Sequence, residues 1–258
     1  KRFETLDFCA RLILRASQLG TPHYLSDTEI EFSQLDRNID FRPFDPEVRS
    51  SDEMELRYQM ALLIRRAYKQ MLFTSTEGTF AVRVDKERIL ITPRNVDRGN
   101  IQPEDMVLVK GMRYESGRKL SRAAWLFRAI FDAQPEINSL IIANPPHLMG
   151  YTVAHEEFDP RVIPESYILL REMPAFPFGT QFRDLKKITD TISPRYPVIM
   201  LENDCMISSG RTLLEAFDRM EVAEYSAKAT ISARNLGGMN PINDEQIADL
   251  VKAFKLIP

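Results

Sequence analysis

Histidine and acidic side chains gather in one stretch of the sequence that could bind a metal ion. His147 and His155 lie eight residues apart, and Glu156 and Glu157 follow the second histidine. Imidazole and carboxylate groups are common ligands of zinc and other divalent metals. In a continuous helix, however, eight residues rise about 12 Å, so the two histidines would reach one ion only if the segment bends. We therefore favour surface or capping roles for both and keep them as weak metal candidates.

A reactive cysteine is the other chemistry that these residue types offer. Cys205 lies between Asp204 and Met206 with no base nearby in the sequence, so a buried structural thiol is favoured over a nucleophile. Cys9 is the second of only two cysteines, too few for a disulfide framework or a cysteine-rich zinc site. This indicates a reducing compartment, and we expect the protein in the cytoplasm.

The composition is that of a globular protein and argues against several functions. Among the 258 residues, 44% are hydrophobic and 28% charged, and 34 basic against 37 acidic side chains leave a formal net charge of −3. The scattered Lys and Arg offer no basic surface for a phosphate backbone, so we expect no nucleic-acid partner. The apolar runs, such as 140–143 and 198–201, fall far short of the roughly 20 residues that span a bilayer. We expect neither a membrane anchor nor a signal peptide.

A mixed set of helices and strands must position these residues. Apolar spacing predicts helices over 3–19 and about 51–70, the second opened by Ser50 and Glu53 as a capping box. Two β-branched runs, 80–84 and 89–92, have the spacing of a hairpin. The remaining predictions are strands over 106–109, 139–143, 198–201 and 206–208, and helices over 121–132, 164–171, 182–192, 212–235 and after Asn243. The order indicates an α/β domain with helices at both ends.

An internal repeat connects the two ends of the chain. Sliding the sequence by 217 residues places 3–30 on 220–247 without a gap, and seven of the 28 pairs are identical. These pairs are Glu4/Glu221, Ala10/Ala227, Ala16/Ala233, Leu19/Leu236, Gly20/Gly237, Asp27/Asp244 and Ile30/Ile247. Two amphipathic helices that end in Leu-Gly supply part of such a match by chance. The alternative is that 1–31 is the tail of a preceding copy of the same domain, followed by a linker over 32–51 and a whole copy over 52–258.

A series of short motifs over about residues 52–240 resembles the class II aldolase/adducin family, including its fuculose-phosphate aldolase-like members. In order, they are Gly78-Thr79-Phe80-Ala81-Val82-Arg83, Leu90-Ile91-Thr92-Pro93, Gln102-Pro103-Glu104-Asp105-Met106-Val107, Pro135-Glu136-Ile137-Asn138, Asn144-Pro145-Pro146, Leu201-Glu202-Asn203 and Leu214-Glu215-Ala216-Phe217. The resemblance implies a three-layer α/β/α sandwich with a central, largely antiparallel sheet, usually assembled as a tetramer. It also implies metal-dependent lyase or epimerase chemistry on sugar phosphates, in which a divalent metal held by three histidines polarises the substrate oxygen.

The positions that hold the metal in this family carry other residues here. The family's His-x-His pair falls on Ile142 and Asn144, and its third histidine falls on Asp204. The acid/base glutamate falls on Ala123, which cannot move a proton. We therefore expect no metal cofactor and a catalytically degenerate site. We also expect Trp125 to fill space that the missing polar groups leave, giving an apolar, closed cavity.

The loop that binds phosphate in the family is altered here but keeps several donors. Its positions carry Gly78, Thr79, Thr92, Arg94 and Asn95. Small residues let an anion approach backbone donors, and Arg94 could pair with a phosphate in a bidentate manner. The alternative is a structural role, in which Thr92 helps to shape a turn and Arg94 is solvated. The sequence by itself favours this alternative over an anion site.

Two functions remain open from the residues. The first is a degenerate aldolase-like domain that acts in assembly or ligand binding beside an active copy or partner, as a homo-oligomer with a small phosphorylated ligand. The second is a working sugar-phosphate aldolase or epimerase whose active site is rebuilt or shared across subunits. It would bind zinc or another divalent metal, with Asp204, His147 and His155 as the candidate ligands. Bound metal favours the enzyme, and phosphate affinity without metal favours the ligand-binding domain.

Overall fold

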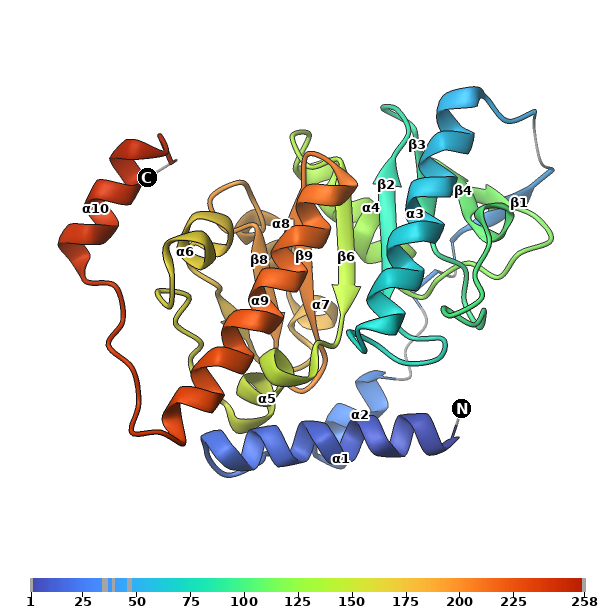
Figure 1. Cartoon of the computed structure of the whole chain (residues 1–258). Helices are drawn as coiled ribbons and strands as arrows, with labels where there is room; N and C mark the ends of the chain where they lie inside the picture. The colour runs from blue at the N-terminus through green and yellow to red at the C-terminus, as the bar shows by residue number, and fades with distance from the viewer. Residues whose placement is uncertain (1, 34–36, 39, 46–47, 257–258) are drawn as a thin grey trace.

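The computed structural model describes residues 2–33, 37–38, 40–45 and 48–256, and within them nine strands form one sheet (Figure 1). The strands are β1 Arg42–Phe44, β2 Thr79–Arg83, β3 Arg88–Ile91, β4 Val107–Lys110, β5 Arg113–Glu115, β6 Ser139–Ala143, β7 Ala175–Phe176, β8 Val198–Leu201 and β9 Cys205–Gly210. Their order across the sheet is β1-β5-β4-β3-β2-β6-β9-β8-β7. Only the outermost pairs, β1 with β5 and β7 with β8, are parallel. The predicted, largely antiparallel sheet is confirmed.

Helices cover both faces of this sheet. The helices of the described residues are α1 Arg2–Leu19, α2 Asp27–Ser33, α3 Ser51–Lys69, α4 Ala124–Ala133, α5 Pro146–Ala154, α6 Pro164–Leu170, α7 Thr180–Arg183, α8 Leu185–Thr191, α9 Leu213–Arg234 and α10 Asp244–Ala253, and not all of them lie on the sheet. Figure 1 shows α3 and α9 on one face and α4 and α8 on the other, which confirms the three-layer α/β/α sandwich. No helix in the described part of the chain is long and apolar enough to cross a bilayer.

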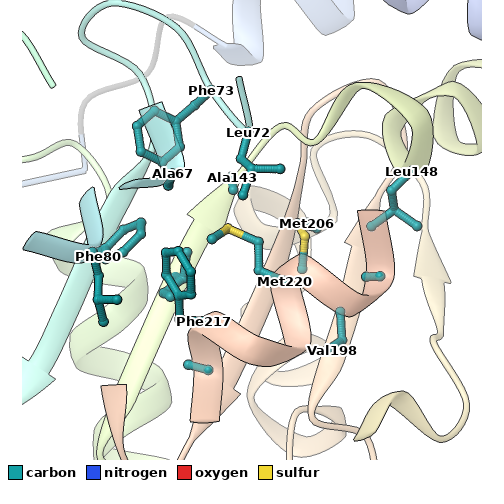
Figure 2. Close-up of a cluster of buried hydrophobic side chains, with 14 of the residues drawn as sticks. Ala67, Leu72, Phe73, Phe80, Ala143, Leu148, Val198, Met206, Phe217 and Met220 are labelled. Atoms are coloured by element: carbon teal, nitrogen blue, oxygen red, sulfur yellow. The ribbon is translucent and has the colours of Figure 1, made fainter. Parts of the chain in front are cut away.

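Two hydrophobic cores lie on the two faces, and successive strand residues face them in turn. In β9, Met206 belongs to the core beneath α9, while Ile207 belongs to the core beneath α4 and α8. This alternation follows from the two-residue period of a strand. Figure 2 shows the first core, where Phe80 from β2 meets Phe217 and Met220 from α9. The rings of Phe80 and Phe217 meet edge to face, with centroids 6.3 Å apart.

A buried ion-pair network ties α3 to the outer strands. Arg57 is fully buried, and its guanidinium donates to Glu53 Oε1 (2.8 Å), Glu115 Oε2 (2.9 Å) and the carbonyl of Met106 (2.6 Å). The predicted helix start is confirmed, because the Ser50 hydroxyl accepts from the backbone N–H of Glu53. The Glu53 carboxylate, however, pairs with Arg57. The network thus fixes the helix against β4 and β5 through charges that water does not reach.

The segment predicted as a linker, 32–51, contains an edge strand. Arg42–Phe44 forms β1 and pairs in parallel with β5. Phe41 and Phe44 are buried on it. An edge strand tolerates Pro43 because one side of its backbone needs no ladder partner. Within the predicted linker, positions 34–36, 39 and 46–47 lie outside the described residues.

Candidate ligand-binding pocket

A pocket of about 660 Å³ opens at one end of the sheet, where β2 begins and β6 ends. The pairing of the strands brings these segments together at one end of the sheet. Thr79 of β2 lies opposite Ile142 of β6, and Ala143 of β6 lies opposite Met206 of β9. The tight turn between β8 and β9 therefore reaches the same end. The pocket collects most of the predicted site positions: Gly78, Thr79, Arg94, Asn95, Ala123, Ile142, Asn144 and Asp204.

The three positions expected to align with the family's metal ligands lie together in this pocket and form a different arrangement. Ile142 contributes a hydrocarbon side chain. Asn144 turns its amide nitrogen to the backbone carbonyl of Asp204. The Asp204 carboxylate accepts a hydrogen bond of 2.7 Å from Gln181 Nε2. Burial raises the pKa of Asp204, and the bond from Gln181 offsets this only in part.

These residues do not fit a divalent metal. Ile142 has no lone pair to give, and the side-chain nitrogen of Asn144 is used as a donor. Asp204 alone would be a single ligand, whereas zinc sites use at least three protein ligands. Among the residues that the structure describes, no three His, Cys, Asp or Glu side chains converge so as to hold a metal ion.

The two weak histidine candidates lie at opposite ends of α5, outside the pocket that contains Asp204. His147 Nδ1 is 2.6 Å from Glu224 Oε1, and the same carboxylate accepts the backbone N–H of His147. His155 adopts a left-handed backbone at the end of α5 (φ 52°) and stacks on His23, with ring centroids 4.1 Å apart. Neither imidazole caps the helix: His147 contacts a carboxylate of α9, and His155 Nε2 lies 3.0 Å from Asn203 Oδ1.

A buried arginine that the sequence did not single out organises the altered phosphate loop. Arg98 donates to the carbonyls of Glu77, Val96 and Gly78, each at 3.0 Å. Its burial lowers the pKa to about 10, so the guanidinium stays charged at neutral pH. Gly78 has φ +70°, and a Cβ there would lie 2.6 Å from the ring of Phe73. This turn therefore requires glycine.

The remaining loop positions divide into pocket residues and a structural residue. Thr79 and Ser121 share a hydroxyl hydrogen bond of 3.1 Å at the pocket wall. Arg94 and Asn95 are exposed at its mouth. Thr92 is fully buried, and its hydroxyl both accepts from the N–H of Phe80 and donates to the carbonyl of Phe80. Thr92 thus holds β3 to β2, which matches the structural alternative for this position.

The opposite wall is aromatic, and it leaves the pocket open. The rings of Trp125 and Phe182 have centroids 5.6 Å apart and line the space. The prediction that Trp125 closes an apolar cavity is wrong, because arginine, amide, hydroxyl and carboxyl groups share the lining. Gln181 is only 4% exposed, and its Oε1 has no hydrogen-bond partner among the described residues. A buried acceptor without a donor is unfavourable until a bound molecule supplies one.

Cys205, next to Asp204, is a structural thiol. Burial raises its pKa well above the ordinary value, and the neighbouring carboxylate raises it further. The raised pKa favours the protonated thiol at neutral pH, which is the less nucleophilic form. This outcome agrees with the buried role predicted for it.

The sheet order, the two helical layers and the position of the pocket define a known class of protein. The family model for the class II aldolase and adducin N-terminal domain matches residues 58–231. The chain belongs to the class II aldolase and adducin family.

Individual relatives in this family include enzymes of different activities. Methylthioribulose-1-phosphate dehydratase from Methylococcus capsulatus is 32% identical over 100 residues, which cover 38% of this chain but only 48% of that enzyme. The 3-oxo-tetronate 4-phosphate decarboxylase from Haemophilus influenzae is 25% identical over 200 residues, covering 74% of this chain and 93% of that enzyme. Among solved structures, L-fuculose 1-phosphate aldolase from Glaciozyma antarctica has a TM-score of 0.66 at 17% identity, covering 81% of this chain and 86% of that one. The last likeness concerns the fold alone.

Proposed function

We propose that this chain is a catalytically degenerate class II aldolase-like domain that binds a small phosphorylated ligand without a metal ion. The observation that carries the proposal is the contrast within one pocket. Ile142 and Asn144 stand where the family's metal ligands belong, while Arg94 and Arg122 line an open space of about 660 Å³. The pocket is open although these positions carry residues that do not suit a metal.

The polar groups of the pocket suit a ligand with an anionic end and a hydroxylated end. Arg94, Asn95 and Thr79 lie on the loop side, where guanidinium, amide and hydroxyl groups can donate to phosphate oxygens. Gln181 Oε1, which is buried and receives no hydrogen bond from any described residue, suits a ligand hydroxyl. The two sequence relatives described above are each named for a phosphorylated substrate, which supports the same ligand class.

Calorimetric titration with glycerol 3-phosphate tests this proposal, after elemental analysis of the same sample for zinc and other divalent metals. We expect a saturable signal that EDTA does not change. Arg94→Gln should weaken binding by about tenfold, the scale of one charged hydrogen bond. Arg211→Gln is the matched control, because Arg211 is an exposed arginine that follows the far end of β9. No binding at millimolar ligand would overturn the proposal.

The same two measurements identify the other candidate functions. Stoichiometric metal that survives dialysis would support a working lyase or epimerase with a rebuilt or shared site. If the chain binds neither metal nor phosphate, assembly beside an active partner remains as the candidate function. Sedimentation of the purified chain would then decide whether it forms the tetramer expected from the family resemblance.

A further inference from the structure

Helix α1 is fixed to the domain by one face and leaves an apolar stripe on the other. Phe8, Ala16 and Leu19 are buried. Leu6 and Leu14 are 64% and 55% exposed. Because residues four positions apart lie on the same face of a helix, Leu6, Ala10 and Leu14 form one exposed stripe. Figure 1 shows α1 lying across one end of the domain, next to α5. A stripe of this kind in a helix so firmly placed calls for a partner.

Close backbone contacts and hydrogen bonds fix the position of α1 on α5. Gly150 in α5 faces the helix backbone, because a Cβ at this position would lie 3.0 Å from Arg15 Cβ and 3.3 Å from the backbone nitrogen of Ala16. After the helix, the N–H of His23 donates to the carbonyl of Val153 (2.8 Å), and Asn203 Nδ2 donates to the carbonyl of His23 (2.7 Å). The position of α1, and thus of its exposed stripe, is well determined.

The internal repeat extends from the sequence to the three-dimensional structure. The alignment by 217 residues places α1 on 219–236, which includes all but the first six residues of α9, and α2 on the start of α10. The helix starts match in detail. Ahead of α2, Ser26 and Glu29 bond reciprocally through backbone N–H and side-chain oxygen, at 2.9 and 3.4 Å. Asn243 and Gln246 make the same pair of bonds ahead of α10, at 3.1 and 2.9 Å. Capping boxes are common at helix starts, but these two fall at aligned positions of the repeat and so extend the match beyond the apolar pattern.

The two matching helices bury opposite faces. The α9 positions that align with the exposed stripe of α1, Leu6, Ala10 and Leu14, are Ala223, Ala227 and Ile231, and all three are buried in the core of the domain. Conversely, Tyr225 and Leu236 of this second segment align with Phe8 and Leu19 of α1. They are 60% and 88% exposed, whereas Phe8 and Leu19 are buried on this domain.

We propose that the stripe formed by Leu6, Ala10 and Leu14 packs in the core of a second aldolase-like domain, encoded ahead of Lys1 in the same polypeptide. In this arrangement α1 occupies in that preceding domain the place that the aligned part of α9 occupies in this one, and α2 corresponds to α10. One face of α1 completes the core of the preceding domain, and the other rests on α5 of the domain described here. The proposal is independent of the ligand proposed above.

Cys9 provides a direct probe, because it aligns with Ser226, which is buried in α9. In the 258-residue chain Cys9 is an exposed free thiol and Cys205 a buried one. We expect Ellman's reagent to label one thiol rapidly in this chain, and Cys9→Ser to abolish that phase. In the polypeptide extended to its natural start, labelling of Cys9 should be at least tenfold slower. An equal rate in both, or a gene with no aldolase-like domain ahead of Lys1, would overturn the proposal.

A substitution on the stripe gives a second, independent readout. Leu14→Glu should leave the melting temperature of the 258-residue chain nearly unchanged, because that side chain is already exposed. In the extended polypeptide it should lower the melting temperature by several degrees. Ser17→Glu is the control on the same helix, since Ser17 and its counterpart Arg234 are both exposed. Equal, small effects of both substitutions in the extended polypeptide would contradict the inference.

Discussion

Replacing Arg57 by methionine should destabilise the domain by about 3–5 kcal/mol at pH 7, the range for removal of one partner from a buried ion pair. Arg57 is fully buried and satisfies Glu53, Glu115 and the carbonyl of Met106. Methionine fills part of the volume but donates no hydrogen bond. Two buried carboxylates would then lose their principal counter-charge.

The destabilisation caused by Arg57→Met should depend on pH, and the pKa of Glu115 determines in which direction. Burial alone would raise the pKa of Glu115, but hydrogen bonds from Arg57 and Arg49 lower it below the ordinary value of 4.5. In the native protein Glu115 therefore contributes stability above that pH, and this stability is lost as the pH falls through the lowered pKa. Without Arg57, ionisation of Glu115 stabilises the folded state less. The difference in stability between variant and native protein should therefore shrink as the pH falls below 4.5.

Urea unfolding followed by circular dichroism at pH 7 and at about pH 4 measures both effects. Arg211→Met is the matched control, because Arg211 is exposed and pairs only loosely, at 3.5 Å, with Glu215. We expect it to change stability by less than about 0.5 kcal/mol. A loss below 1 kcal/mol in Arg57→Met, or a difference that grows in acid, would refute the reasoning.

Three further predictions concern the pocket. Gly78→Ala should destabilise the protein by at least about 1–2 kcal/mol in urea unfolding, because of its positive φ and the contact with Phe73; a neutral effect would contradict the strained turn. The triple substitution Ile142→His, Asn144→His and Asp204→His should create zinc binding detectable by elemental analysis, and failure of the folded variant to bind zinc would contradict the assignment of these positions. The raised pKa of Asp204 means that its carboxyl stabilises the folded state only while it is protonated, so the native protein should lose stability as the pH rises from about 4. Asp204→Asn should remove this loss. Parallel pH profiles of the two proteins would refute this.

The strands of four to six residues were predictable because their apolar runs are a local signal, whereas the shorter β1, β5 and β7 were not predicted. Apolar residues flank the short turn at 202–204, and the structure confirms the strands predicted over 198–201 and 206–208 as β8 and β9. β1 was not predictable, because Pro43 and the polar neighbours of this segment are typical of a loop. Its strand conformation depends on β5, which lies about 70 residues further along the chain. α5 was missed for a related reason, since its start at Pro146 resembles a turn although proline is favoured at the first position of a helix.

The candidate site was predictable only where a family pattern supplied the positions. Ile142, Asn144 and Asp204 are distant in sequence or carry no chemical signal of their own, and pairing within the sheet brings them together. Gln181 and Arg98 were missed because their importance comes from burial and from hydrogen bonds to distant segments or backbone carbonyls. Neither residue type has a local spacing rule that predicts such a role.

The central position of β6 has a consequence for how this family changes over time. β6 is bonded to β2 on one side and to β9 on the other, so its backbone is held by its neighbours whatever side chains its last residues carry. Ile142 and Asn144 sit at this end of the strand and face the pocket. Once selection for catalysis is relaxed, such positions can drift while the scaffold persists. A gene duplication would then leave a descendant that has lost its chemistry long before its architecture decays.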